Sequence, residues 1–178
     1  MDKENDNRFI EFNSFSWWCD DDSILYNNRF NLSYYTKEKI ENANFPNDSI
    51  VEGHIIEISN KSLNCSKFIN METDYFEKIY DEIYRINFEK LAKASFDGCD
   101  GGQFEVRIGI KNGFNEYFKK LGLWSPPCVK SKGLQLKIEL ILKYYEEIIE
   151  ISEFKKWQND ILKDEYTIYK KNRKRKRK

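Results

Sequence analysis

The sequence predicts an α+β protein with an antiparallel sheet of about five strands and helices packed on one face of that sheet. Two kinds of pattern predict this class. Short stretches that alternate apolar and polar residues are typical of half-buried strands, and the connections between them are of hairpin type. Two longer stretches repeat apolar residues at helical spacing. The expected order of elements is β-β-β-α-β-β-α.

The first third of the chain predicts three strands. Residues 9–19 are rich in aromatic and other β-prone residues, and the polar run 20–23 ends them as a turn. Residues 24–36 form the second expected strand because their apolar positions alternate with asparagine and serine. Residues 41–48 contain a proline and several asparagines, which indicates a loop. Residues 50–58 then predict a third strand.

The helical patterns begin in the middle of the chain. Thr73 is a suitable N-cap, and apolar residues at helical spacing follow it as far as about Leu91. A second and longer helix is expected from near Lys132, and helical periodicity continues through residues 154–164. The apolar residues that define the first helix are Phe76, Ile79, Tyr80, Ile83 and Ile86, and those of the second are Leu134, Leu136, Ile138, Leu140, Ile141, Tyr144, Tyr145 and Ile148.

The clearest hairpin lies between the two helices. A glycine-rich segment, residues 97–102, leads into residues 104–111, where apolar residues alternate with charged ones and with one glycine. Asn112-Gly113 is a strong tight-turn signal, so residues 114–124 are expected to return as the partner strand. Because the polar positions share one face, that face of the sheet is expected to be wet and the other to be covered by helices.

Charge is divided unevenly along the chain. Residues 170–178 carry eight cations, while residues 1–169 hold all 30 acids and only 22 of the 30 bases, so a body of charge −8 precedes a tail of charge +8. We predict a single domain over residues 1–169 and a disordered tail over 170–178. The cations of the tail are Lys170, Lys171, Arg173, Lys174, Arg175, Lys176, Arg177 and Lys178.

The termini and the cysteines bear on location and cofactors. The first eight residues are polar, and no apolar run approaches the roughly 18 residues that span a bilayer. We therefore expect a cytoplasmic protein that is not bound to a membrane. The four cysteines are then expected to be free thiols, and their wide spacing gives no zinc-ligand pair. No cofactor or metal is expected.

Three features are candidate catalytic, metal-binding or contact sites. His54 is the only histidine, so a histidine-dependent active site would have to use it, but a strand histidine satisfied by its neighbours is the simpler interpretation. Asp97 and Asp100 lie in a glycine-rich segment whose spacing fails as a calcium loop and fits a helix-to-strand turn. Asp20, Asp21 and Asp22 form either a solvated turn, a weak cation site or a contact for a cationic partner.

Part of the pattern is similar to known proteins. The helix that begins near Phe76, the turn Asp97-Gly98, the strand end Trp124-Ser125-Pro126 and the helix start Gly133-Leu134 together resemble a loose group of small bacterial α+β proteins. Some members of that group resemble immunity proteins of polymorphic toxin systems. The resemblance covers residues 76–148, brings no catalytic residues and implies a non-enzymatic binding protein.

These observations favour a protein-binding module, of immunity type, whose acidic body meets a cationic protein partner. The expected contacts are Asp20, Asp21, Asp22, Asp97, Asp100 and an outward-facing Trp17 or Trp18. The alternative is a protein that associates with nucleic acid non-specifically through residues 170–178, although the same tail could simply promote solubility or fold back on the body. A third hypothesis is an enzyme that uses His54.

Overall fold

The structure is a computed structural model that describes residues 7–15, 27–43, 50–60, 64–94, 103–124, 131–164, 167–168 and 171. Its six strands are β1 (Arg8–Phe15), β2 (Asn28–Tyr35), β3 (Gly53–Asn60), β4 (Cys65–Met71), β5 (Gln103–Asn112) and β6 (Asn115–Trp124). They form one antiparallel sheet in the order β4-β3-β2-β1-β5-β6. The predicted α+β class is confirmed, with six strands in the described part of the chain instead of about five.

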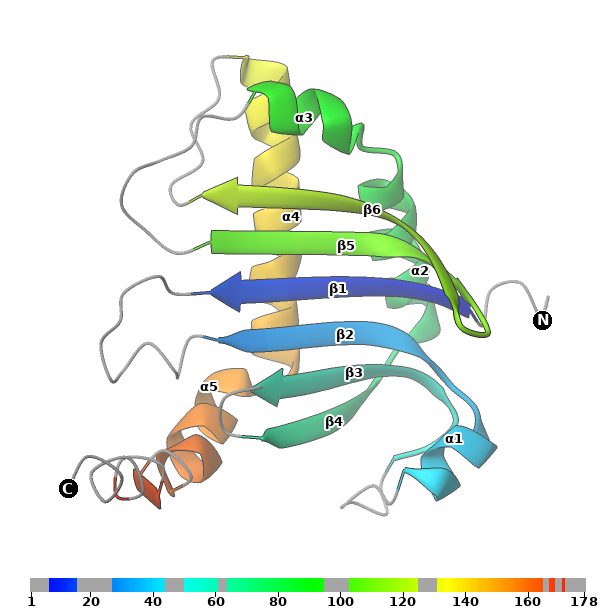
Figure 1. Cartoon of the computed structure of the whole chain (residues 1–178), viewed down its shortest axis with the longest axis vertical. Coiled ribbons are helices and arrows are strands. Elements are labelled where there is room, and N and C mark those ends of the chain that lie inside the picture. Colours follow the sequence, from blue (N-terminus) through cyan, green and yellow to red (C-terminus); the bar gives the residue numbers. More distant parts are fainter. Residues whose placement is uncertain are drawn as a thin grey trace.

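The helices lie mainly on one side of this sheet. They are α1 (Lys37–Asn42), α2 (Thr73–Tyr84), α3 (Phe88–Ala94), α4 (Lys132–Ile151), α5 (Phe154–Trp157) and the π-helix η3 (Gln158–Leu162). Figure 1 shows α2 and α4 behind the same face of the sheet. We call the opposite face the open face; Glu11, Asn31, Glu57, Arg107 and Lys120 form one row across it, in register on five successive strands. None of the described helices is long and apolar enough to cross a membrane.

The apolar core fills the layer between the sheet and these two helices. Phe12 of β1 lies opposite Phe30 of β2 and Val106 of β5, and all three side chains are fully buried. The ring of Tyr145 from α4 packs on this row, with centroids 5.8 Å from Phe12 and 5.5 Å from Phe30. The first predicted helical stripe is buried as expected, because Phe76, Ile79, Tyr80, Ile83 and Ile86 all join the core. Leu136 is an exception on α4, since it is 57% exposed.

Two elements differ from the sequence-based prediction in the first half of the chain. Helix α1 was not predicted, and it includes the first two residues of the segment expected as a loop. Its N-cap Thr36 accepts a hydrogen bond from the backbone nitrogen of Lys39 at 3.3 Å. Strand β4 was not predicted, because Lys67 interrupts its helix-facing positions. The Lys67 ammonium group donates to the Ser152 carbonyl oxygen at 3.0 Å, just beyond α4, where a cation stabilises the end of the helix.

The helix expected from Thr73 to about Leu91 is two helices. It breaks after Tyr84, and α3 starts again at Phe88. The Asn87 side chain accepts a hydrogen bond from the backbone nitrogen of Lys90 at 2.8 Å, which is N-capping of the second helix. Thr73 is the first residue of α2 instead of its cap, and its hydroxyl group lies 3.2 Å from Nδ1 of His54.

The predicted hairpin of β5 and β6 is confirmed, and two glycines shape it. Gly113 is the first of the two loop residues and has φ +59°, in the left-handed region that favours glycine. Gly109 lies where the backbone of β6 approaches β5 closely. A Cβ atom on Gly109 would lie 2.0 Å from the carbonyl oxygen of Tyr117 and 2.7 Å from Cα of Phe118. Only glycine therefore fits at position 109.

We predict that Gly109→Ala lowers the free energy of unfolding by about 1–3 kcal/mol, because the hairpin backbone must move apart to admit the methyl group. Gly133→Ala is the matched control, since a Cβ atom on Gly133 meets nothing within 4 Å and alanine favours the helix. Urea unfolding of both variants measures the effect. If Gly109→Ala proves as stable as the wild type, the close approach at Gly109 is wrong.

Candidate functional site

The site residues predicted from the sequence lie almost entirely outside the described residues. Of the tail, only Lys171 is described, and its side chain is exposed. The predicted contacts that fall outside are Trp17, Trp18, Asp20, Asp21, Asp22, Asp97, Asp100, Lys170, Arg173, Lys174, Arg175, Lys176, Arg177 and Lys178. These contacts stay predictions, and the described residues offer other surfaces.

His54 packs in the core, as its structural interpretation expects. Its side chain is 3% exposed, on the helix-facing side of β3. The imidazole ring stacks on Phe76 of α2 with centroids 4.0 Å apart, and Tyr34 meets its edge at 5.4 Å. Nδ1 lies 3.2 Å from the Thr73 hydroxyl oxygen. These contacts give His54 a structural role at the junction of β3 and α2.

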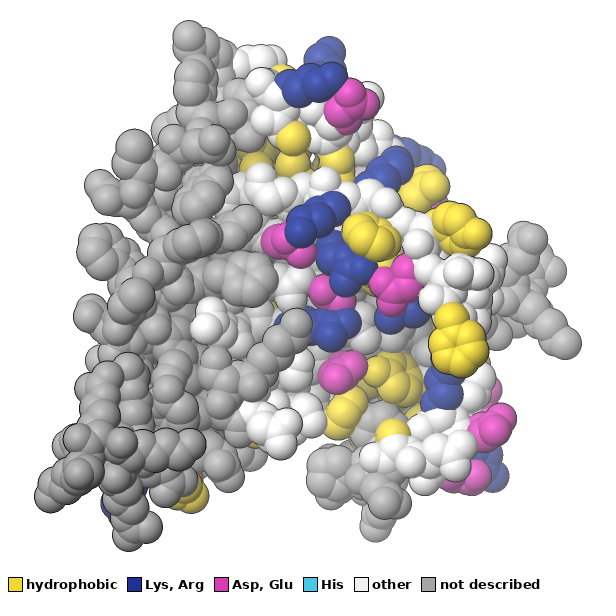
Figure 2. Space-filling view, viewed as in Figure 1, with side chains coloured by type: hydrophobic (Ala, Val, Ile, Leu, Met, Phe, Trp, Pro, Cys, Tyr) yellow, Lys and Arg dark blue, Asp and Glu magenta, His cyan; other side chains and the backbone are white. Residues whose placement is uncertain are grey.

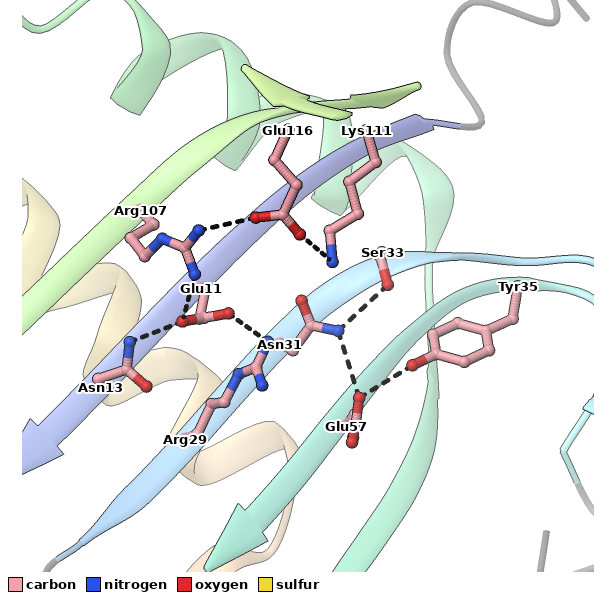
Figure 3. Close-up of polar contacts among 10 residues, drawn as sticks. All are labelled: Glu11, Asn13, Arg29, Asn31, Ser33, Tyr35, Glu57, Arg107, Lys111 and Glu116. Atoms are coloured by element: carbon pink, nitrogen blue, oxygen red, sulfur yellow. Dashed lines mark hydrogen bonds and ion pairs between the residues drawn. The ribbon is translucent and has the colours of Figure 1, made fainter. Parts of the chain in front are cut away.

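A network of charged side chains occupies the open face of the sheet. Its centre is Glu11 on β1, whose side chain is only 5% exposed (Figure 3). The carboxylate forms ion pairs with Arg29 of β2 and with Arg107 of β5, the latter at 3.2 Å. The side-chain amide of Asn13 donates a further hydrogen bond to it at 2.8 Å. Three adjacent strands are thus joined through one carboxylate.

Burial by itself raises the pKa of Glu11, because a charged group loses its hydration in the protein. The hydrogen bond from Asn13 and the positive charges of Arg29 and Arg107 act in the opposite direction and outweigh burial. The pKa of Glu11 therefore lies below its ordinary value of 4.5, and the carboxylate is ionised at neutral pH.

The network continues toward the sheet edge through Glu116 of β6. Arg107 donates to Glu116 at 2.8 Å, and the ammonium group of Lys111 lies 3.1 Å from its other oxygen (Figure 3). The hydrogen bond from Lys111 lowers the pKa of Glu116. The same cations lie over aromatic rings, with the Arg107 guanidinium carbon 4.1 Å from the ring centroid of Phe118. Figure 2 shows basic and acidic side chains interspersed across the open face.

A second group of polar contacts on the open face, centred on Glu57, is built from neutral donors. The carboxylate of Glu57 on β3 accepts hydrogen bonds from the Tyr35 hydroxyl at 2.9 Å and from the Asn31 side-chain amide at 3.3 Å. Burial and the neighbouring carboxylate of Glu57 raise the pKa of Tyr35. Among the described residues, no lysine or arginine lies within 4 Å of the Glu57 carboxylate. Glu57 therefore differs from Glu11 and Glu116, which both pair with cations.

The opposite surface of the molecule, formed by α2 and α4, is acidic. The helices α2 and α4 together contain eight carboxylates and four lysines. Two cross-helix hydrogen bonds join the helices: Tyr75 donates to Glu147, and Tyr144 donates to Glu82 at 2.6 Å. The hydrogen bond from Tyr75 lowers the pKa of Glu147. The carboxylates of this helical acidic surface are Asp74, Glu77, Asp81, Glu82, Glu139, Glu146, Glu147 and Glu150.

Exposed aromatic side chains gather where α2 meets the β5–β6 hairpin. Phe114 at the hairpin loop is 108% exposed relative to its reference value, Tyr117 is 66% exposed and Phe118 is 45% exposed. Tyr84 at the end of α2 is 43% exposed. The Lys119 ammonium group joins the two elements, because it donates to the Tyr84 carbonyl oxygen at 2.7 Å and lies 4.0 Å from the centroid of its ring. We call these four residues the aromatic end.

We predict that Glu11→Gln lowers the free energy of unfolding at neutral pH by about 3 kcal/mol, because two largely buried guanidinium groups lose their shared carboxylate. Because the pKa of Glu11 is lowered in the folded state, its contribution to the free energy of unfolding is present above the ordinary pKa. That contribution is lost as the pH falls through the folded-state pKa. The difference between wild type and variant should therefore shrink as urea titrations move from pH 7 toward about pH 3.

Glu89→Gln is the control for this measurement. Glu89 pairs with Lys93 on α3, but both side chains are more than 70% exposed, so the substitution is expected to change stability little. A Glu11→Gln variant that unfolds like the Glu89→Gln variant at pH 7 would contradict the role assigned to the network.

Among the described residues, no three side chains of histidine, cysteine, aspartate or glutamate come together in a group that could hold a metal ion. Comparison of the chain with protein-family models, with curated proteins and with solved structures finds no match. The resemblance to immunity-type proteins therefore stays a prediction, and the functional argument rests on the surfaces described above.

Proposed function

We propose that this chain is a non-enzymatic protein-binding module that neutralises a cationic protein partner, as immunity proteins do. The observation that carries the proposal is the helical acidic surface. Its carboxylates come from two adjacent helices, and most of them are exposed, including Asp74, Asp81 and Glu146. A surface dominated by one sign of charge attracts a partner of the opposite sign and speeds their encounter.

The aromatic end supports the same proposal. Steering by charge brings partners together, but most of the binding energy of protein interfaces comes from a few large side chains, often aromatic, that become buried. Tyr84 continues α2 beyond Asp81, so the aromatic end adjoins one end of the helical acidic surface. A cationic partner that covers both would bury Phe114 and Tyr117 and pair its own cations with α2. The predicted contacts at Trp17, Trp18 and Asp20–Asp22 would extend this interface.

The proposal is tested by affinity capture from nuclease-treated lysate of the host with three tagged baits. They are the wild type, an Asp81→Lys/Glu146→Lys double variant and a Glu38→Lys control that reverses an exposed charge on α1. The wild type and the control are expected to capture the same basic protein, and the double variant is expected to lose it. The purified pair should then show an association rate that falls by about tenfold in the double variant.

Equal capture by all three baits would contradict the role of the helical acidic surface. A captured partner that is acidic would also contradict the proposal, because the two proteins would then repel each other.

The alternative function is non-specific nucleic-acid binding through the basic tail, favoured by eight cations in residues 170–178 and by the exposed side chain of Lys171. Deletion of residues 170–178 is expected to abolish DNA and RNA binding measured by fluorescence anisotropy. The full-length chain should lose affinity with salt at a log–log slope of about 0.9 per phosphate contacted. If the truncated chain binds as tightly as the full-length chain, the tail is not a nucleic-acid contact.

A further inference from the structure

A cavity of about 270 Å³ opens on the open face, at the end of the sheet where β1 begins and β2 ends. It lies beside the charged network and is lined by residues of β1, β2, α1, β3 and β5, most of them polar. Those used below are Arg29, Asn31, Tyr35, Lys39, Glu57 and Lys111. Small-molecule sites in proteins have volumes of about 300–1,000 Å³, so this cavity suits a ligand at the small end of that range.

One part of the cavity wall accepts hydrogen bonds. Glu57 presents a carboxylate that has neutral hydrogen-bond partners but no described cation within 4 Å. Asn31 is 5% exposed, and its Oδ1 atom is buried without a hydrogen-bond partner among the described residues. Its amide nitrogen is already engaged with Glu57 and Ser33, so Oδ1 is the free acceptor (Figure 3). A buried acceptor of this kind calls for a donor.

Another part of the wall offers donors. Nε of Arg29 is buried and has no hydrogen-bond partner among the described residues, although the same guanidinium group pairs with Glu11. Lys111 also lines the cavity, with its charge compensated by Glu116. Lys39 lines the cavity with an exposed side chain and forms no ion pair with a described carboxylate. One cavity thus carries a carboxylate, Glu57, and an ammonium group, Lys39, that do not pair with each other.

We propose that this cavity binds a small zwitterion of the α-amino-acid type. Its ammonium group pairs with Glu57 and donates to Oδ1 of Asn31, while its carboxylate pairs with Lys39 and accepts from Nε of Arg29. Such a ligand supplies a cation for Glu57, an anion for Lys39 and partners for both unpaired polar atoms. An anion alone would leave Glu57 without a cation. The site is independent of the helical acidic surface on the other side of the molecule.

The first test screens the full-length protein against each of the twenty standard L-amino acids at millimolar concentration by thermal unfolding. Isothermal titration calorimetry then measures the affinity of any that raise the melting temperature. At least one amino acid is expected to bind. Its deamino analogue and its carboxamide analogue, which each lack one charge, are expected to bind at least about tenfold more weakly. No thermal shift with any of the twenty would overturn the proposal, as would equal affinity for the deamino analogue, which would indicate an anion site only.

The second test compares two matched substitutions. Glu57 accepts a hydrogen bond from Tyr35 at 2.9 Å, and Glu52 accepts one from Tyr34 at 3.1 Å, but only Glu57 lines the cavity. Glu57→Gln keeps the side-chain size and is expected to weaken amino-acid binding by at least about tenfold, while Glu52→Gln leaves it unchanged. Circular dichroism confirms that both variants fold. Binding by Glu57→Gln at wild-type affinity would refute the placement of the ammonium group.

Discussion

The ion pairs of Glu11 with Arg29 and Arg107 are the interaction on which the sheet depends. β1 is one of the two central strands, and both sides of β1 are buried: Phe12 faces the helices, while Glu11 faces the open side. A buried carboxylate is costly unless cations and hydrogen bonds compensate it. The compensating arginines come from the strands on either side of β1, so the charge is tolerated only when all three strands pair in the observed register.

The two faces of the sheet have different roles. The helix-facing side holds the apolar core, and there even the single histidine is packed between rings. The open side holds acidic and basic side chains in nearly equal number. Glu57 and Lys39 at the cavity form no ion pair with a described residue, and this observation motivates the zwitterion site. The outer surfaces of α2 and α4 belong neither to the apolar core nor to the open face, and they carry the acidic charge proposed to attract a protein partner.

Much of the fold could be predicted from local patterns, and the site could not. The alternation in β5, the Asn112-Gly113 turn and the apolar stripe of α2 are local patterns that can be recognised without any distant residue. Strand β4 was missed because Lys67 faces the helices, and the break before α3 was missed because apolar spacing continues across it. The site joins Glu11 to partners 18 and 96 positions away, and only the strand register brings them together. The sequence did indicate that Arg107 and Lys111 face the wet side.

The central network specifies how β1, β2 and β5 pair, because breaking it leaves a buried charge without a partner, and it need not add net stability over an apolar core. Arg29 also lines the cavity. The most direct measurement replaces all three members of the central network, Glu11, Arg29 and Arg107, by methionine and records both the free energy of unfolding and amino-acid affinity. Replacing a whole buried ion network by apolar groups is often neutral or stabilising. We expect an unfolding free energy within about 1 kcal/mol of the wild type or above it, with amino-acid binding lost because the Arg29 guanidinium group no longer lines the cavity. A loss of more than about 3 kcal/mol, or unchanged binding, would contradict it.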